Sequence, residues 1–131
     1  MAIDCIAEIP GAVELSKWFG GFPSFHDANA ELQINGDGTG WLKAYGFGMT
    51  DKVDQNGYYV LEKHFVATFL FEKLRSVALT EFQPGRSILY DLDIKKSGDS
   101  FEISFGSSYG VAGSIIAERL SITFEIGVKA P

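Results

Sequence analysis

The sequence predicts a mainly β domain, borderline with the α+β class, built as an antiparallel β sandwich or a strongly bent sheet of about seven strands with one short N-terminal helix. Three observations carry this prediction. Apolar and polar residues alternate along several segments, glycine-rich turns of hairpin length separate those segments, and helical apolar spacing is clearest near the start of the chain. The 131 residues fit a single domain, 1–131, and 46% of them are hydrophobic, so the chain can bury a core.

The helix is expected over residues 12–19, AVELSKWF. Pro10 and Gly11 favour a helix start, and the pair Gly20-Gly21 favours its end. Its apolar stripe has the spacing i, i+3, i+4 and i+7 and consists of Leu15, Trp18, Phe19 and Phe22. A helix this short depends on packing against another element.

Strand periodicity follows the helix. Residues 28–35 alternate between apolar and polar side chains, and the segment 35–40, NGDGTG, predicts a turn. In the next strand, 41–49, bulky residues share one face and small residues such as Gly46 share the other. Small residues on one face predict a bulge or a neighbour that approaches closely. A longer turn is expected at 51–57.

The segment 58–82 fits the apolar spacing of a helix and also that of a strand. Apolar residues such as Leu61 and Phe65 recur at helical spacing and at strand spacing. Aromatic and valine residues dominate and favour strands, which we expect at about 58–72 and 76–82.

The last third of the chain is expected to hold three strands. A turn at Pro84-Gly85 precedes them, and they lie at 88–94, 101–105 and 116–126. In the final strand the even-numbered residues are predicted to share the core face, with Glu118 as the polar exception.

The charge and the cysteine content reduce the number of functions and compartments that we expect for this protein. The formal net charge is −6, which disfavours nucleic acid and weakly favours a basic partner, although acidity also keeps a domain soluble. One cysteine, Cys5, cannot form an internal disulfide. The start of the chain does not resemble a secretory signal, and no apolar run reaches the length of a membrane span. We therefore expect a cytoplasmic protein without a membrane role.

The pair His26-Asp27 is the most conspicuous candidate for chemistry. Adjacent residues of an extended chain point to opposite faces, so a catalytic pair would need a bend, and Ser24, Ser107 and Ser108 carry no nucleophile motif. We favour a structural clasp, with Asp27 accepting backbone N–H groups and His26 donating to a carbonyl or carboxylate. A binding surface ranks second and catalysis third.

Other motifs give weaker signals. The two histidines, Cys5 and the scattered carboxylates lack the short spacing of metal ligands, so neither a metal nor a cofactor is expected. The segment 35–40 lacks the lysine and hydroxyl residue of a phosphate loop. In the loop 106–113, glycines serve backbone geometry, while Tyr109 beside Gly110 could anchor a ligand.

The stretch WFGGFPSFHDA, residues 18–28, followed by an alternating strand, resembles the signature of small bacterial proteins of the immunity protein 50 family. The core Phe25-His26-Asp27-Ala28 is its most specific element, whereas Asn29-Ala30 stands where an acidic-aliphatic pair is expected. Segments that are similar in the same way are 71–82, 87–94 and 108–122.

The resemblance implies a non-enzymatic immunity protein of a polymorphic toxin system. Such a protein binds its cognate toxin, for which the acidic balance favours a basic protein, and blocks the toxin's active site. The binding or structural motif is then formed by Phe25, His26, Asp27, Tyr109 and Gly110.

Two alternatives stay open. The first is a small-molecule-binding or hydrolytic β domain with His26, Asp27 and Tyr109 converging between the helix and the sheet. The second is a homodimer in which sheet edges or an aromatic face pair with themselves.

Overall fold

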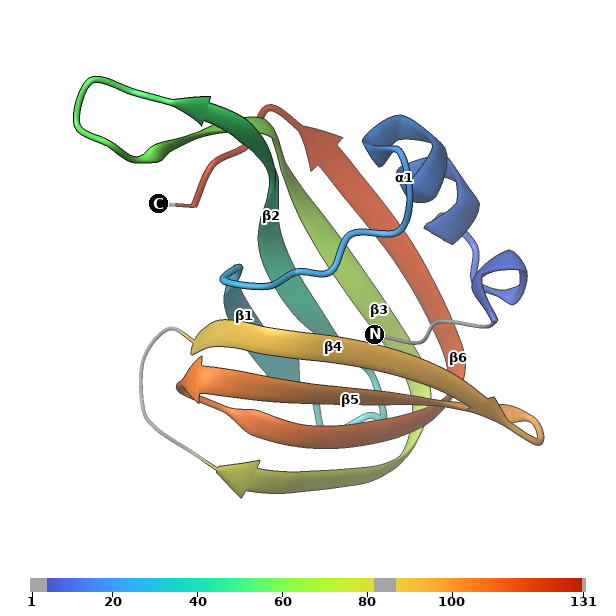
Figure 1. Ribbon diagram of the computed structural model, residues 1–131. Coiled ribbons are helices and arrows are strands. Elements are labelled where there is room, and N and C mark those ends of the chain that lie inside the picture. The colour runs from blue at the N-terminus through green and yellow to red at the C-terminus, as the bar shows by residue number, and fades with distance from the viewer. Residues whose placement is uncertain (1–4, 82–86, 131) are drawn as a thin grey trace.

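A computed structural model describes residues 5–81 and 87–130 of the chain. In this part of the chain one antiparallel sheet of six strands closes into a barrel in the order β1-β2-β3-β6-β5-β4 (Figure 1). The elements are a short 3-10 helix Ile6–Glu8, α1 Ala12–Phe19, β1 Asn29–Ile34, β2 Gly40–Val53, β3 Tyr59–Glu81, β4 Ser87–Ser97, β5 Ser100–Tyr109 and β6 Ala112–Ile126.

The mainly β class with one short α-helix is confirmed. Because a single sheet closes on itself, the strongly bent sheet describes the architecture better than the sandwich does. The turn expected at Pro84-Gly85 lies outside the described residues.

The sheet has six strands rather than about seven because the two strands expected within 58–82 are one continuous strand, β3. This strand bends without a turn. Lys73 has a left-handed φ of 53°, and the register against β6 shifts between Leu74 and Ser76. A β-bulge of this kind curves a strand while its hydrogen-bonded ladder continues.

The helix α1 forms where the sequence predicts it, between Gly11 and Gly20. Leu15 is fully buried, and the other three members of the apolar stripe pack partly buried against the core. The segment before α1 is tied to the sheet because the Ile122 N–H donates to the Pro10 carbonyl at 2.8 Å. The helix thereby lies against β6, as Figure 1 shows.

The small residues of β2 face the interior, where a neighbour approaches closely as the sequence predicts. A Cβ at Gly46 would lie 2.4 Å from the ring of Phe65, which is fully buried. Phe65, Phe69 and Phe71 on β3 are the largest fully buried side chains and fill the centre of the barrel.

The expected core face of the last strand is wrong in part. Leu120 and Ile122 face the core, but before them Ile115 and Ala117 are buried, so the inward face changes between residues 117 and 120. Glu118 therefore lies on the outer surface, where its carboxylate is 3.1 Å from the Arg75 guanidinium. Glu118, the polar exception in the alternating pattern of this strand, lies at the point where the inward face changes.

Candidate functional site

The barrel closes through a short seam between its first and fourth strands. β1 pairs with β4 at two positions, Asn29 with Ile88 and Ala30 with Ser87. Two more main-chain hydrogen bonds continue the seam before β1 begins. The Asp27 N–H donates to the Leu89 carbonyl at 2.9 Å, and the Leu89 N–H donates to the Ala28 carbonyl at 2.8 Å.

The segment that adds these bonds, Phe25–Ala28, is a tight turn. Phe25 and Asp27 have left-handed φ values of 58° and 64°, and the Ala28 N–H donates to the Phe25 carbonyl. Aspartate tolerates this conformation, while phenylalanine rarely adopts it. Burial of the Phe25 ring, 5.8 Å from Phe65 and 5.5 Å from Phe69 between ring centres, offsets the backbone strain.

The turn also brings the side chains of His26 and Asp27 together. His26 Nε2 lies 3.6 Å from Asp27 Oδ2, and both side chains are more than half exposed. The two side chains can share one face because the chain bends at this point and is not extended. A contact this exposed stabilises a fold by about 1 kcal/mol at most, and it is an ion pair only when the imidazole is protonated.

The other histidine nitrogen contacts the fourth strand. His26 Nδ1 lies 2.9 Å from the Tyr90 carbonyl oxygen, so Nδ1 carries the hydrogen and donates it. Tyr90 has no partner in the β4–β5 register and therefore forms a β-bulge. The bulge leaves the Tyr90 carbonyl available for a contact outside the strand pair. The imidazole satisfies this carbonyl, and its ring meets the Tyr90 ring edge-on at 5.5 Å.

The second motif, Tyr109-Gly110, attaches to β4 from the opposite side. Tyr109 pairs with Ile88, and Gly110 packs so closely that a Cβ there would lie 2.3 Å from Ser87 Oγ. The same hydroxyl accepts a hydrogen bond from the Val111 N–H at 2.9 Å. Both sequence motifs thus meet at the first four residues of β4, although the Tyr109 side chain itself is half exposed.

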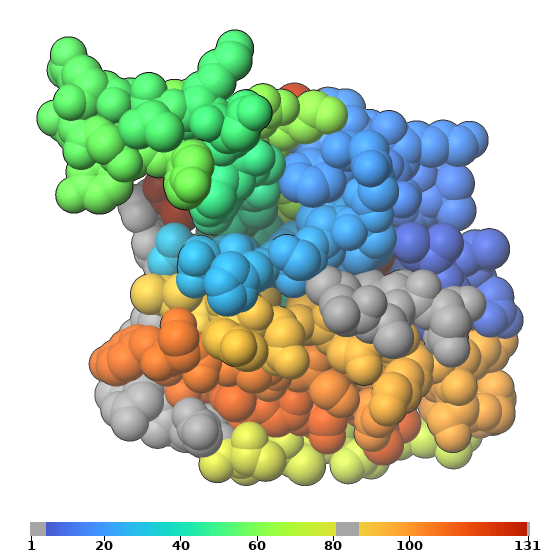
Figure 2. Space-filling model, viewed as in Figure 1, coloured from blue at the N-terminus to red at the C-terminus, as the bar shows by residue number. Residues whose placement is uncertain are grey.

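A projecting hairpin forms a long exposed part of the described structure. Beyond the paired residues Gly48 and Glu62, β2 and β3 continue away from the barrel as an arm, residues 49–61, which stands clear of the body in Figure 2. No residue of the arm is buried. Its exposed large apolar side chains are Met49, Val53, Tyr58, Tyr59, Val60 and Leu61.

A groove of about 640 Å³ lies at the base of the arm, and we call it the arm groove. Apolar walls come from Phe19, Phe47 and Met49, and His26 and Asp27 line it as well. Tyr109 is not among its lining residues, so His26, Asp27 and Tyr109 do not line this groove together.

Carboxylates dominate the charge of the arm groove. Asp27, Asp51 and Glu62 line it, against one ammonium group, that of Lys63. Lys63 Nζ donates to the Phe19 carbonyl at 3.3 Å and lies 6.0 Å from the Phe19 ring centre. The lysine is thereby held at the wall. No sequence motif marks Asp51, Glu62 or Lys63, because only the hairpin pairing places them beside Asp27.

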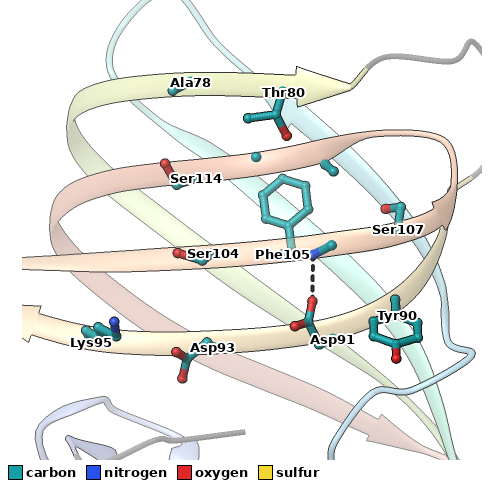
Figure 3. Close-up of a pocket in the computed structure, with 13 residues that line it drawn as sticks. Ala78, Thr80, Tyr90, Asp91, Asp93, Lys95, Ser104, Phe105, Ser107 and Ser114 are labelled. Carbon is teal, nitrogen blue, oxygen red and sulfur yellow. Dashed lines mark hydrogen bonds between the residues drawn. The ribbon is translucent and has the colours of Figure 1, made fainter.

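A second groove of similar volume crosses the outer face of β3, β6, β5 and β4 (Figure 3). Its floor consists of small residues, including Ser104 and Ser114, and Tyr90, Asp91 and Asp93 line it along β4. Asp91 Oδ1 accepts the Gly106 N–H at 2.9 Å across the bulge. The bulge thus exposes Tyr90 and fixes Asp91 on the sheet surface.

The described residues contain no group of three or more His, Cys, Asp and Glu side chains that could hold a metal ion. Among them, no helix has the length and apolar character needed to cross a membrane. Cys5 is buried, and its Sγ lies 4.0 Å from the Ile94 carbonyl oxygen.

Comparisons with known proteins identify no relative. No family model matches the sequence, and no curated protein and no solved structure gives a significant match.

Proposed function

We propose that this chain is a non-enzymatic binding protein that docks a basic protein partner in the arm groove. The observation that carries the proposal is the groove itself. Three carboxylates and apolar walls lie next to an arm whose large apolar side chains are exposed to solvent. Apolar anchors beside charges of one sign are typical of surfaces that bind proteins of the opposite charge.

The two parts of this surface have different tasks. The arm offers apolar and aromatic side chains such as Tyr58 and Tyr59, which bury area when a partner covers them. Asp51 and Glu62 attract lysine and arginine side chains and set their orientation. The net charge of −6 adds a long-range attraction that accelerates encounter with a basic protein.

The specific role that we propose is that of an immunity protein, in keeping with the resemblance of the segment around Phe25-His26-Asp27-Ala28. The bound partner would be a basic toxin. Inhibition would come from steric and electrostatic occlusion of the toxin's active site, without any bond being made or broken by this chain. The turn that contains His26 supports the groove by holding its wall to β4.

The test is calorimetric binding to the purified basic toxin domain encoded beside the gene. Charge reversal in the double variant Asp51→Lys/Glu62→Lys should weaken binding about 10- to 100-fold, because two attractive contacts become repulsive. Glu102→Lys makes the same kind of charge change on β5, which lies across the barrel from the arm, and should leave affinity unchanged.

Two results would contradict the proposal. One is equal affinity of the wild type and the double variant, which would place the contact elsewhere. The other is the absence of both binding and cell protection for every basic protein encoded next to the gene, which would remove the immunity role.

A further inference from the structure

The third strand extends beyond its neighbour β2, so among the described residues its last part is paired on one side only. β3 pairs with β2 as far as Phe71 opposite Gly40, and from Leu74 onward it pairs with β6 alone. The Leu74 N–H donates to the Gly38 carbonyl, so the turn before β2 covers that position. Within the described residues, the segment 75–81 has a strand on one side only, as the lowest strand in Figure 1 shows.

Between Arg75 and Glu81, this edge has neither the charged side chains nor the proline that usually prevent edge pairing. Proteins protect open edges with charged side chains, proline or irregular strands. The five residues Ser76–Thr80 carry no charge, and the register against β6 is regular from Ser76 to Leu79. The adjacent Arg75 is directed away, because its guanidinium lies 3.1 Å from Glu118 on β6 and 3.4 Å from Asp99 before β5.

The exposed side chains of the edge continue the apolar core face. Val77 lies directly opposite Ile115, which is buried, and therefore on the same face of the sheet. Val77 and Leu79 are nevertheless 39% and 45% exposed. A strand added at this edge would pair with the main-chain groups on the side away from β6 and cover both side chains.

We propose that the added strand is the same edge of a second copy of this chain, paired antiparallel around a two-fold axis at Ala78. In that register Val77 of one copy faces Leu79 of the other on one face, and Ser76 faces Thr80 on the opposite face. Apolar residues meet apolar residues, hydroxyls meet hydroxyls, and no charge is repeated across the axis within Ser76–Thr80. The arm groove is on another part of the barrel and contains no residue of this edge. A test of the dimer is therefore independent of a test of the proposed function.

The sharpest test uses the position of the axis. In Ala78→Cys the two new thiols lie on residues directly opposite, with Cα atoms about 5 Å apart, within reach of a disulfide. In Thr80→Cys, on the same strand face, four residues separate the paired positions and the Cα atoms lie about 13 Å apart. Both residues are exposed, and the native Cys5 is buried.

Mild oxidation, followed by non-reducing electrophoresis, should link Ala78→Cys into dimers at least about tenfold faster than Thr80→Cys. Equal rates for the two variants, or no linked dimer from Ala78→Cys, would overturn the proposed register. The folded state of each variant is checked by circular dichroism.

Sedimentation of the full chain provides a second readout. The wild type should show a dimer whose fraction rises with concentration, and Leu79→Lys should abolish it. Val53→Lys places the same change at an exposed valine of the arm and should leave the dimer intact. A wild type that stays monomeric, or a dimer lost in Val53→Lys and kept in Leu79→Lys, would refute edge pairing.

Discussion

His26 stabilises the barrel through one ring nitrogen and leaves the other facing Asp27 at the surface. The contact with the Tyr90 carbonyl joins residues that are 64 positions apart in the chain. At the residue scale, His26, for which the sequence favours a structural role, therefore has a contact at each ring nitrogen. Its imidazole and the Asp27 carboxylate also form part of the wall of the arm groove.

Replacing His26 tests this structural role. His26→Ala should lower the free energy of unfolding by about 1 kcal/mol, the usual effect of losing one hydrogen bond. For a domain of this size the corresponding fall in Tm is about 3–5 °C. Asp27→Asn keeps a residue that tolerates left-handed φ and should change Tm by less than about 1 °C. An unchanged Tm for His26→Ala would show that the contact with Tyr90 does not stabilise the fold.

Gly110 should be far less replaceable than Gly57. A Cβ at Gly110 would lie 2.3 Å from Ser87 Oγ and 2.6 Å from Ser87 Cα, and φ is 107°. Gly110→Ala should therefore destabilise the fold by more than about 2 kcal/mol through overpacking and strain. Gly57 also has positive φ, at 85°, but nothing lies within 4 Å of a Cβ there, so Gly57→Ala should cost about 1 kcal/mol. Equal losses in chemical denaturation would contradict the close approach at Ser87.

Asp37 provides a pH-dependent test in the turn before β2. The Thr39 hydroxyl, and then the Thr39 N–H, donate to its carboxylate at 2.6 and 3.1 Å and lower the pKa of Asp37 below its ordinary value of 3.8. Because the folded-state pKa is depressed, this contribution to stability is present above the unfolded-state pKa and is lost as pH falls through the folded-state pKa. Thr39→Val should raise the Asp37 pKa measured by carboxyl NMR titration, and identical titration curves would contradict the hydrogen bond.

At the scale of elements, the arm and the barrel have separate roles. The arm is a two-stranded extension without a buried residue, and such a hairpin contributes little to folding by itself. The buried side chains of β2 lie before Gly48, and those of β3 lie after Glu62. Binding and folding can therefore be altered independently.

Shortening the hairpin tests that separation. Replacing residues 49–61 with Asn-Gly would connect the paired residues Gly48 and Glu62 by a two-residue turn. The variant should keep a Tm within about 3 °C of the wild type, because no core side chain is removed. Binding of the proposed basic partner should fall at least about 100-fold, since the apolar anchors are lost. A cooperative fold that still binds with wild-type affinity would exclude the arm from the interface.

Elements with strong local signals could be predicted from the sequence. Glycines bound α1 on both sides, and alternation marks β1 and β2. The bend inside β3 could not be predicted, because Lys73 and the neighbouring bulge supply it and neither is a turn signal. The exchange of faces near Glu118 was visible only as a polar residue at an expected core position.

At the scale of the whole molecule, closure of the barrel depends on contacts between distant parts of the chain. Periodicity predicts that strands exist, but it does not say that β1 lies beside β4. For the same reason the sequence identified His26 and Asp27 without their partners Tyr90 and Leu89, and it did not bring Asp51 and Glu62 to the same groove. The Phe25–Ala28 turn affects the whole molecule, because its two main-chain hydrogen bonds with Leu89 extend the short β1–β4 seam that closes the barrel.

The charge of the molecule leads to a prediction about salt. Partner binding at the acidic arm groove should weaken as ionic strength rises, since salt screens attraction between exposed charges. The association rate should fall more than the dissociation rate rises. Surface plasmon resonance at about 50 and 500 mM NaCl measures the two rates. These concentrations lie on either side of the ionic strength at which the Debye length is about 8 Å. An association rate that does not change with salt would contradict an electrostatic contribution.

Amide hydrogen exchange, measured by NMR at Asp27 and Leu89, tests the central claim that the His26 turn closes the barrel. The two N–H groups make the seam bonds, so in the wild type both should exchange far more slowly than in an unstructured chain. In His26→Ala both should exchange about fivefold faster, while the amides of Phe69 and Ile122 on the β3–β6 ladder change less. Fast exchange of Asp27 and Leu89 in the wild type, or rates that His26→Ala leaves unchanged, would show that the turn does not close the barrel.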